Sequence, residues 1–123
     1  HKFTVVAVSE TWENDLTKIN IPGYNCHLKP RTGRVGGGVA IYVCDHLQYS
    51  IRTDLVQYEC DNFECTFVNV YAANRFCDRV TVGVIYRPPN TDIGLFNVNY
   101  AKLLGALSHG KDKCYTTGQY YCV

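Results

Sequence analysis

A two-residue apolar period recurs along this 123-residue chain and constrains its fold more than any other feature. In the segment 79–86, Val80, Val82, Val84 and Tyr86 fall on one face. This period is that of a β-strand, in which successive side chains point to opposite faces. We therefore expect a fold built mainly from strands.

Three further segments carry strand signals. The continuous apolar run 5–8 predicts a strand that is buried on both faces. Residues 38–44 form a strand pattern after a glycine-rich lead, and 63–71 alternate as a half-buried strand with Glu64 on its polar face. Only seven residues separate 63–71 from 79–86, which predicts an antiparallel pair.

The apolar period changes to steps of three and four residues after the prolines at 88–89. Residues 93–107 are expected to form an amphipathic helix with Thr91 or Asp92 as its N-cap. Residues 113–117 resemble a final strand. The predicted order is five strands, a helix and a last strand, which is typical of an α/β layered protein with a mixed sheet.

The composition agrees with one globular domain that spans 1–123. The chain is 46% hydrophobic and 19% charged, and its net charge of +1 indicates no overall basic field for nucleic acid. No stretch approaches the roughly 18 apolar residues that a membrane helix needs, so we expect no membrane contact.

The cysteine pattern argues against a disulfide framework. The seven cysteines are an odd number without a CxxC pair, so we expect reduced thiols with no disulfide partner in an intracellular protein. Cys44 and Cys65 fall inside strand patterns and are expected to be buried. Cys26 and His27 are adjacent rather than spaced for zinc, and the four histidines are scattered, so the sequence does not favour a zinc site.

Basic residues cluster in the first third of the chain. Lys29, Arg31 and Arg34 lie close together, and Arg87 lies far away in sequence. These four are candidate nucleic-acid contacts, although for the cluster taken by itself the sequence favours a solvated loop. The glycines at 36–38 precede a strand and lack a following Gly-Lys-Ser/Thr, so they predict a hinge into a close-packed strand rather than a phosphate loop.

The run 5–8 leads directly into Ser9, Glu10, Thr11 and Trp12. A carboxylate at the end of a buried strand suits a surface turn, but strand ends also carry ligands and catalytic groups. Trp12 is expected to pack beneath the loop.

Four stretches in this order resemble a known family: AVSETW, RVGGGVAIYV, VGVIYRPPN and CYTTGQYY. The chain is similar to the endonuclease/exonuclease/phosphatase superfamily, and specifically to the apurinic-endonuclease-like domain of non-LTR retrotransposons. The resemblance implies a four-layer α/β sandwich of the DNase I-like type, present as a central fragment. It also implies Mg²⁺-dependent nicking of DNA in the nucleus. The nick would prime reverse transcription by a reverse transcriptase domain of the same polyprotein.

The resemblance assigns roles to four residues. Glu10 falls on the metal ligand of the family, and Tyr86 on the tyrosine that lines the site. Gln119 and Tyr121 fall on the Asp and Asn of the family's Gly-Asp-Phe-Asn, and neither can replace the original group. The family's first-strand Asn would precede the chain, and its terminal Asp and Asp-His pair would follow it. We therefore expect an inactive fragment with weak Mg²⁺ binding.

Two alternatives stay open at this stage. The chain is a non-catalytic module of the same fold that binds nucleic acid or protein, or it is a truncated phosphatase of the superfamily. In either case a fragment with little beyond one sheet would leave the apolar faces of 63–67 and 80–84 partly uncovered. We therefore expect a poorly soluble or molten chain.

Overall fold

The structure is a computed structural model that describes residues 4–12, 19–31, 36–59, 63–71 and 79–109, and the backbone of 113–119. Within these ranges the chain forms seven strands, one α-helix and one 3₁₀ helix. The strands are β1 (Val5–Ser9), β2 (Tyr24–Lys29), β3 (Val39–Cys44), β4 (Gln48–Ile51), β5 (Glu64–Tyr71), β6 (Arg79–Tyr86) and β7 (Lys113–Gln119). The helices are η2 (Thr53–Tyr58) and α1 (Ile93–Ser108).

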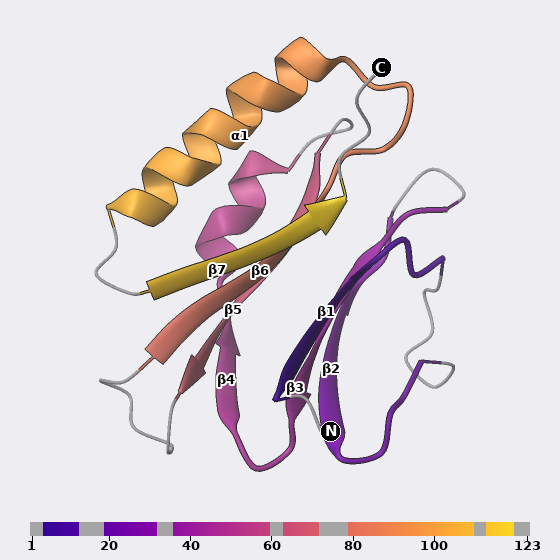
Figure 1. Cartoon of the computed structure of the whole chain (residues 1–123), viewed down its shortest axis with the longest axis vertical. Helices are drawn as coiled ribbons and strands as arrows, with labels where there is room; N and C mark the ends of the chain where they lie inside the picture. The colour runs from indigo at the N-terminus through magenta and orange to yellow at the C-terminus, as the bar shows by residue number, and fades with distance from the viewer. Residues whose placement is uncertain are drawn as a thin grey trace.

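The strands form two sheets (Figure 1). The first sheet has the order β1-β3-β2 and is antiparallel throughout. The second has the order β4-β5-β6-β7, in which β7 pairs with β6 in parallel after the crossover through α1. The protein is therefore a mixed α/β fold with two sheets and one α-helix in its described part.

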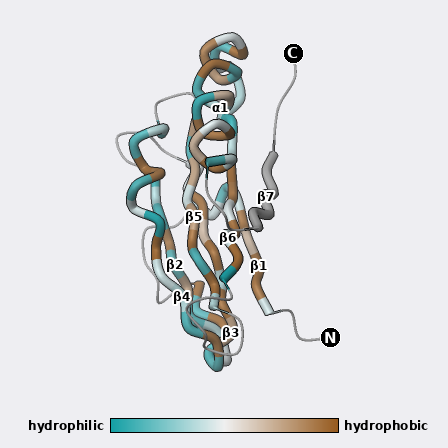
Figure 2. The backbone as a smooth tube through the Cα atoms, turned by 90° about the vertical axis from the view of Figure 1, so that its left-hand side faces the viewer, coloured by the Kyte–Doolittle hydropathy of each residue, from teal (hydrophilic) through white to brown (hydrophobic). Residues whose placement is uncertain are grey.

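The two sheets pack face to face, and α1 covers the outer face of the second sheet (Figures 1 and 2). One core cluster lies between the sheets and contains Val39, Ile41, Val43, Val68, Val70, Val84 and Tyr86. A second core cluster lies between the second sheet, α1 and η2 and contains Leu55, Phe63, Cys65, Phe67, Ile85, Phe96 and Leu103. The described layers are thus sheet, sheet and helix.

Several sequence expectations are confirmed by this arrangement. β5 and β6 pair in antiparallel register from Glu64↔Tyr86 to Tyr71↔Arg79. The N-cap of α1 is Asp92, whose side chain accepts hydrogen bonds from the backbone N–H groups of Gly94 and Leu95. These contacts satisfy two donors that every helix start leaves free.

Two expectations were wrong. Six strands rather than five precede α1 in the described part of the chain. The two strands for which the sequence named no segment are β2 and β4, which are edge strands without an apolar run. β5 is buried on both faces rather than half-buried, since its second face lies against the first sheet. Of the two faces expected to be partly uncovered, that of 63–67 is buried against α1 and η2, whereas in 80–84 Val84 is buried and Val80 and Val82 are partly buried. A poorly soluble or molten chain stays a prediction.

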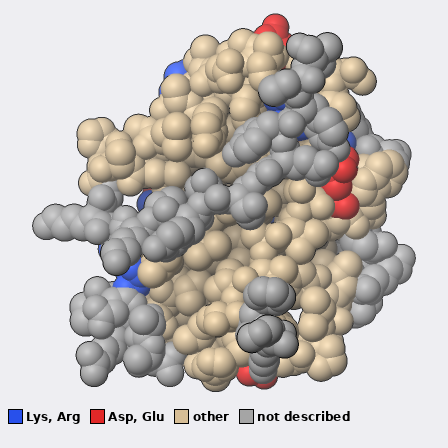
Figure 3. Space-filling model, in the orientation of Figure 1, with Lys and Arg blue, Asp and Glu red and all other residues tan. Residues whose placement is uncertain are grey.

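The described residues contain no helix that is long and apolar enough to span a membrane. Cys26, Cys44 and Cys65 are free thiols, and the latter two are buried as expected. On the face shown in Figure 3, the Lys and Arg side chains lie at separate places rather than in one patch. This distribution agrees with the small net charge.

Candidate functional site

Glu10 and Tyr86 meet at one edge of the two sheets. Glu10 follows the last residue of β1, and Tyr86 is the last residue of β6. The Tyr86 hydroxyl donates a hydrogen bond to Oε1 of Glu10, across 76 residues of sequence. The resemblance assigns both residues to one site, and the fold places their side chains in contact.

Glu10 adopts a backbone conformation that is uncommon for a side chain of its kind. Its φ is 54°, and that of Trp12 is 56°, both in the left-handed region. Strain of this sort costs about 1–3 kcal/mol per residue and persists only where the surroundings enforce it. Here the N–H of Trp12 donates to the Gly37 carbonyl at 2.9 Å, and that of Thr11 donates to the Gly38 carbonyl at 3.3 Å.

The glycines at 36–38 make this approach possible. All three have positive φ, between 71° and 88°. A Cβ at Gly37 would lie 2.2 Å from the Arg31 guanidinium, and one at Gly38 would lie 2.7 Å from the Thr11 hydroxyl. The predicted close packing is confirmed. Its reason is that both the segment that carries Glu10 and the side chain of Arg31 pack against the glycine turn.

Trp12 does not pack beneath the loop as expected. Its side chain is 65% exposed, and it lies over Gly36, where a Cβ would come within 3.0 Å of the indole. An exposed indole beside a strained carboxylate is open to contact with a ligand.

A buried ion pair lies beside Tyr86. Arg31 donates to Oε2 of Glu64 through Nε at 2.8 Å and Nη2 at 2.5 Å, and the Gly38 N–H donates to Oε1 at 2.9 Å. The two side chains are only 13% and 8% exposed. The Arg31 guanidinium carbon also lies 5.9 Å from the centre of the Tyr86 ring, within the range of a cation–π contact.

These contacts form one continuous structure, which we call the glutamate brace: Arg31, Glu64, Gly37, Gly38 and Thr11. Glu64 fixes Arg31 and the glycine turn, and the turn fixes the segment that carries Glu10. Glu64 was not predicted as a site residue, because the alternation of 63–71 puts it on the polar face of a half-buried strand. The pairing of 63–71 with 79–86 was a usable signal, since it sets Glu64 directly across from Tyr86.

The other basic candidates are also drawn into the fold. Lys29 forms an ion pair with Glu59 and donates to the Cys65 carbonyl at 3.3 Å, and burial lowers its pKa. Arg87 is fully buried, and its Nη1 donates to the Thr91 carbonyl at 2.9 Å. Arg34 lies outside the described residues.

The basic candidates therefore form no open patch among the residues that the structure describes. For Lys29, Arg31, Arg34 and Arg87, contact with nucleic acid stays a prediction. A phosphate that approached Arg31 or Arg87 would have to displace buried contacts.

Gln119 is placed by its backbone beside the site. β7 pairs with β6 so that Gln119 lies opposite Tyr86. The carboxyl ends of β1, β6 and β7 thus meet at one edge, which is where open α/β sheets bind ligands. Tyr121 lies outside the described residues.

Among the described residues at this edge, Glu10 offers a partly exposed carboxylate to a metal ion. Glu10 is partly exposed, whereas both oxygens of Glu64 are engaged by Arg31 and Gly38. Mg²⁺ takes oxygen ligands and is commonly held by one or two carboxylates with waters and a substrate phosphate. Glu10 therefore fits a weakly held Mg²⁺.

No family model, no curated protein and no solved structure matches this chain.

Proposed function

We propose that this chain is the central part of a Mg²⁺-dependent DNA endonuclease domain of a non-LTR retrotransposon, with little cleavage activity of its own. The observation that carries the proposal is the contact between Glu10 and Tyr86, which joins two sheets at the carboxyl ends of their strands. DNA is the proposed substrate, and a reverse transcriptase domain is the proposed neighbour in a nuclear polyprotein.

The layer order supports the four-layer sandwich of this superfamily as part of the proposal. Three layers are described: two sheets and α1. The outer face of the first sheet is also covered, since Ala40, Tyr42 and Cys44 are buried and the Tyr42 hydroxyl donates to the Ile19 carbonyl at 2.6 Å. Ile19, which precedes β2, would then belong to the fourth layer.

The residues of the site suit the hydrolysis of a phosphodiester. Glu10 would hold Mg²⁺, which when bound neutralises charge that develops on the phosphate. The Tyr86 hydroxyl donates to the Glu10 carboxylate and so orients it. The glutamate brace holds both residues in place before substrate binds, so that no reorganisation is needed during the reaction.

Gln119 accounts for the proposed low activity. Its backbone lies beside Tyr86, where the family carries an Asp. A neutral amide cannot take a proton from the attacking water, and the loss of a general base typically costs about 10²–10⁴ in rate. The alternative of a basic binding module gains less support, because Lys29 and Arg31 pair with carboxylates and Arg87 is fully buried.

A chimera tests the proposal. The segments that the resemblance places before and after this chain are supplied from a related active domain, and nicking of supercoiled plasmid is measured with Mg²⁺. We expect Gln119→Asp with Tyr121→Asn to nick at least about a hundredfold faster than the unreverted chimera. If the unreverted chimera nicks as fast as the reverted one, the assignment of Gln119 and the argument for low activity are wrong.

A further inference from the structure

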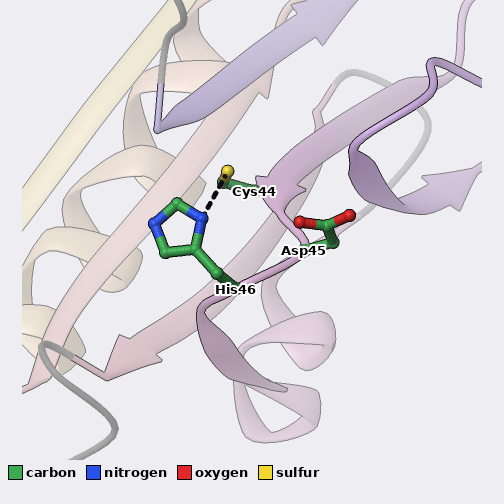
Figure 4. Close-up of side chains that lie close together, drawn as sticks. All are labelled: Cys44, Asp45 and His46. Carbon is green, nitrogen blue, oxygen red and sulfur yellow. Dashed lines mark hydrogen bonds between the residues drawn. The ribbon is translucent and has the colours of Figure 1, made fainter.

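Three metal-ligand side chains lie together in the turn after β3, away from Glu10 in sequence. Cys44 ends β3, and Asp45 and His46 follow it directly. The Cys44 thiol and Nδ1 of His46 are 3.0 Å apart, and the ligand atoms of all three residues lie within 4.8 Å of one another. Figure 4 shows the thiol and the imidazole joined by their hydrogen bond, with the Asp45 carboxylate near them.

The backbone of this turn is fixed by three hydrogen bonds. The Cys44 N–H donates to the Thr4 carbonyl at 2.9 Å, and the Asp45 N–H donates to the Gly23 carbonyl at 2.9 Å. The Leu47 N–H donates to the Cys44 carbonyl at 3.0 Å and closes the turn. The three ligand-bearing residues are thus held from both sides, so only side-chain rotation is needed to change their mutual geometry.

The spacing of the ligand atoms suits a tetrahedral ion. Zn²⁺ lies about 2.3 Å from thiolate sulfur and about 2.0–2.2 Å from nitrogen or carboxylate oxygen, so its ligands lie about 3.3–3.6 Å apart. The Cys44 and His46 atoms need to separate by only about 0.5 Å to reach that range. The Asp45 oxygen lies close enough to complete a three-ligand set by a change of rotamer.

We propose that Cys44, Asp45 and His46 form a binding site for Zn²⁺, separate from the Mg²⁺ site at Glu10. Cys44 is only 1% exposed, whereas Asp45 and His46 are exposed, so the ion enters from solvent and meets the buried sulfur last. Three protein ligands leave the fourth tetrahedral position to water. No spaced zinc motif marks this site, because all three ligands come from consecutive residues.

The donor set selects the class of metal. On binding, the Cys44 thiol releases its proton to solvent, and sulfur and Nδ1 each bond the ion in place of their shared hydrogen bond. A thiolate and an imidazole favour Zn²⁺ over Mg²⁺, which prefers carboxylate, carbonyl and water oxygens. An excess of Mg²⁺ should therefore not displace the ion.

Co²⁺ provides the test, because a bound thiolate gives it a charge-transfer absorption in the near ultraviolet. The full chain, kept reduced, is titrated with Co²⁺ and then with Zn²⁺. We expect the absorption to reach its maximum at one equivalent of Co²⁺ per chain. It should disappear on addition of Zn²⁺ and should not change with excess Mg²⁺. Cys44→Ser should abolish the absorption, and His46→Ala should weaken binding at least about tenfold.

Two control variants separate this site from others. Cys26→Ser removes another thiol, which, unlike that of Cys44, is partly exposed. Glu10→Gln removes the proposed Mg²⁺ ligand. Both variants should leave the Co²⁺–thiolate absorption unchanged. Because Cys44 is buried and its replacement can disturb folding, exposed His46 and Asp45 carry an independent test. An absorption that persists in Cys44→Ser, or binding that is unchanged in both His46→Ala and Asp45→Asn, would overturn the proposal. The proposal would also be overturned if the wild-type chain, shown by circular dichroism to be folded, gave no absorption at millimolar Co²⁺.

Discussion

At the scale of single residues, two Arg–carboxylate pairs of similar geometry differ in their surroundings. Arg31 and Glu64 are buried between the sheets, whereas Arg52 pairs with Asp54, whose side chain is 60% exposed. Exposed pairs contribute about 0–1 kcal/mol. Removal of one partner from a buried pair costs about 3–5 kcal/mol, because it leaves an uncompensated charge.

The first prediction compares these pairs. Glu64→Ala should lower the free energy of unfolding by about 3–5 kcal/mol, since it leaves the Arg31 guanidinium buried without its carboxylate. Asp54→Ala, the matched control, should lower it by less than about 1 kcal/mol. Urea unfolding measures both. Equal losses in the two variants would show that Glu64 does not hold Arg31 as described.

The second prediction concerns pH and His27, whose Nε2 lies 2.9 Å from the Thr66 hydroxyl between the sheets. Burial lowers the pKa of His27, and the nearby Lys29 charge lowers it further. On acidification, His27 of the unfolded chain takes up a proton near its ordinary pKa of about 6.5, at a higher pH than His27 of the folded chain. The free energy of unfolding therefore falls as the pH is lowered from about 6.5 toward the pKa of His27 in the folded chain.

We expect the free energy of unfolding of wild-type chain to decline with acidification from about pH 6.5. His27→Gln should be flatter over the same window, because the group that binds the proton in the unfolded state is gone. Unfolding in urea at a series of pH values checks both. A slope that is the same in the two proteins would assign the pH dependence to other groups.

At the scale of elements, the turn at 36–38 joins the end of β1 to the start of β3. At Gly37 and Gly38 a positive φ is combined with neighbouring side-chain atoms that would lie less than 3.0 Å from an added Cβ. Gly105 offers a contrast, since it lies within α1 and a Cβ there would meet nothing within 4 Å.

The third prediction uses this contrast. Gly38→Ala should destabilise the chain by about 1–3 kcal/mol, because it forces a left-handed alanine against the Thr11 hydroxyl. Gly105→Ala should stabilise it by about 0.4–1 kcal/mol through lower entropy of the unfolded chain. Thermal unfolding of the two variants measures the difference. A neutral Gly38→Ala would mean that the turn does not hold the Glu10 segment.

Much at this scale could be predicted from sequence, and the remainder has physical reasons. The alternation in 79–86 and the period of 93–107 predicted β6 and α1, because each pattern is local. β2 and β4 carry mixed edge sequences, so periodicity does not reveal them. The fate of Arg31 and Arg87 was not predictable, since whether a basic side chain is buried depends on distant partners.

The candidate site divides in the same way. The family resemblance assigned Glu10 and Tyr86 to one site, and the two side chains are in contact. Glu64 became part of the site only through the register of β5 on β6 and the packing of the first sheet above them. The grouping of Cys44 and His46 depends on the conformation of a turn, which composition does not specify.

At the scale of the whole molecule, the core between the sheets couples the first sheet to the rest of the fold. Ile41 lies at its centre with no exposed surface. Ile41→Ala should lower the free energy of unfolding by about 2–5 kcal/mol through the lost apolar contacts and the cavity.

The fourth prediction follows from that coupling. The fluorescence of Trp12, the one tryptophan, reports on the first sheet. The far-ultraviolet circular dichroism signal of the helix reports on α1. In both wild-type chain and Ile41→Ala the two signals should change at the same denaturant concentration, as a cooperative unit does. Separate transitions would mean that the sheets unfold independently and that the brace does not join them.

The central claim is that Glu10 and Tyr86 act together in one phosphodiester-cleaving site, and a double-mutant cycle on nicking rate tests it most directly. The cycle uses the reverted chimera with Glu10→Ala, Tyr86→Phe and both changes, in the presence of Mg²⁺. Each single change should slow nicking at least about a hundredfold. The double variant should be little slower than the worse single variant, because residues that act as a unit are strongly non-additive. Multiplied losses, or a Glu10→Ala chimera that nicks at the full rate, would contradict the claim.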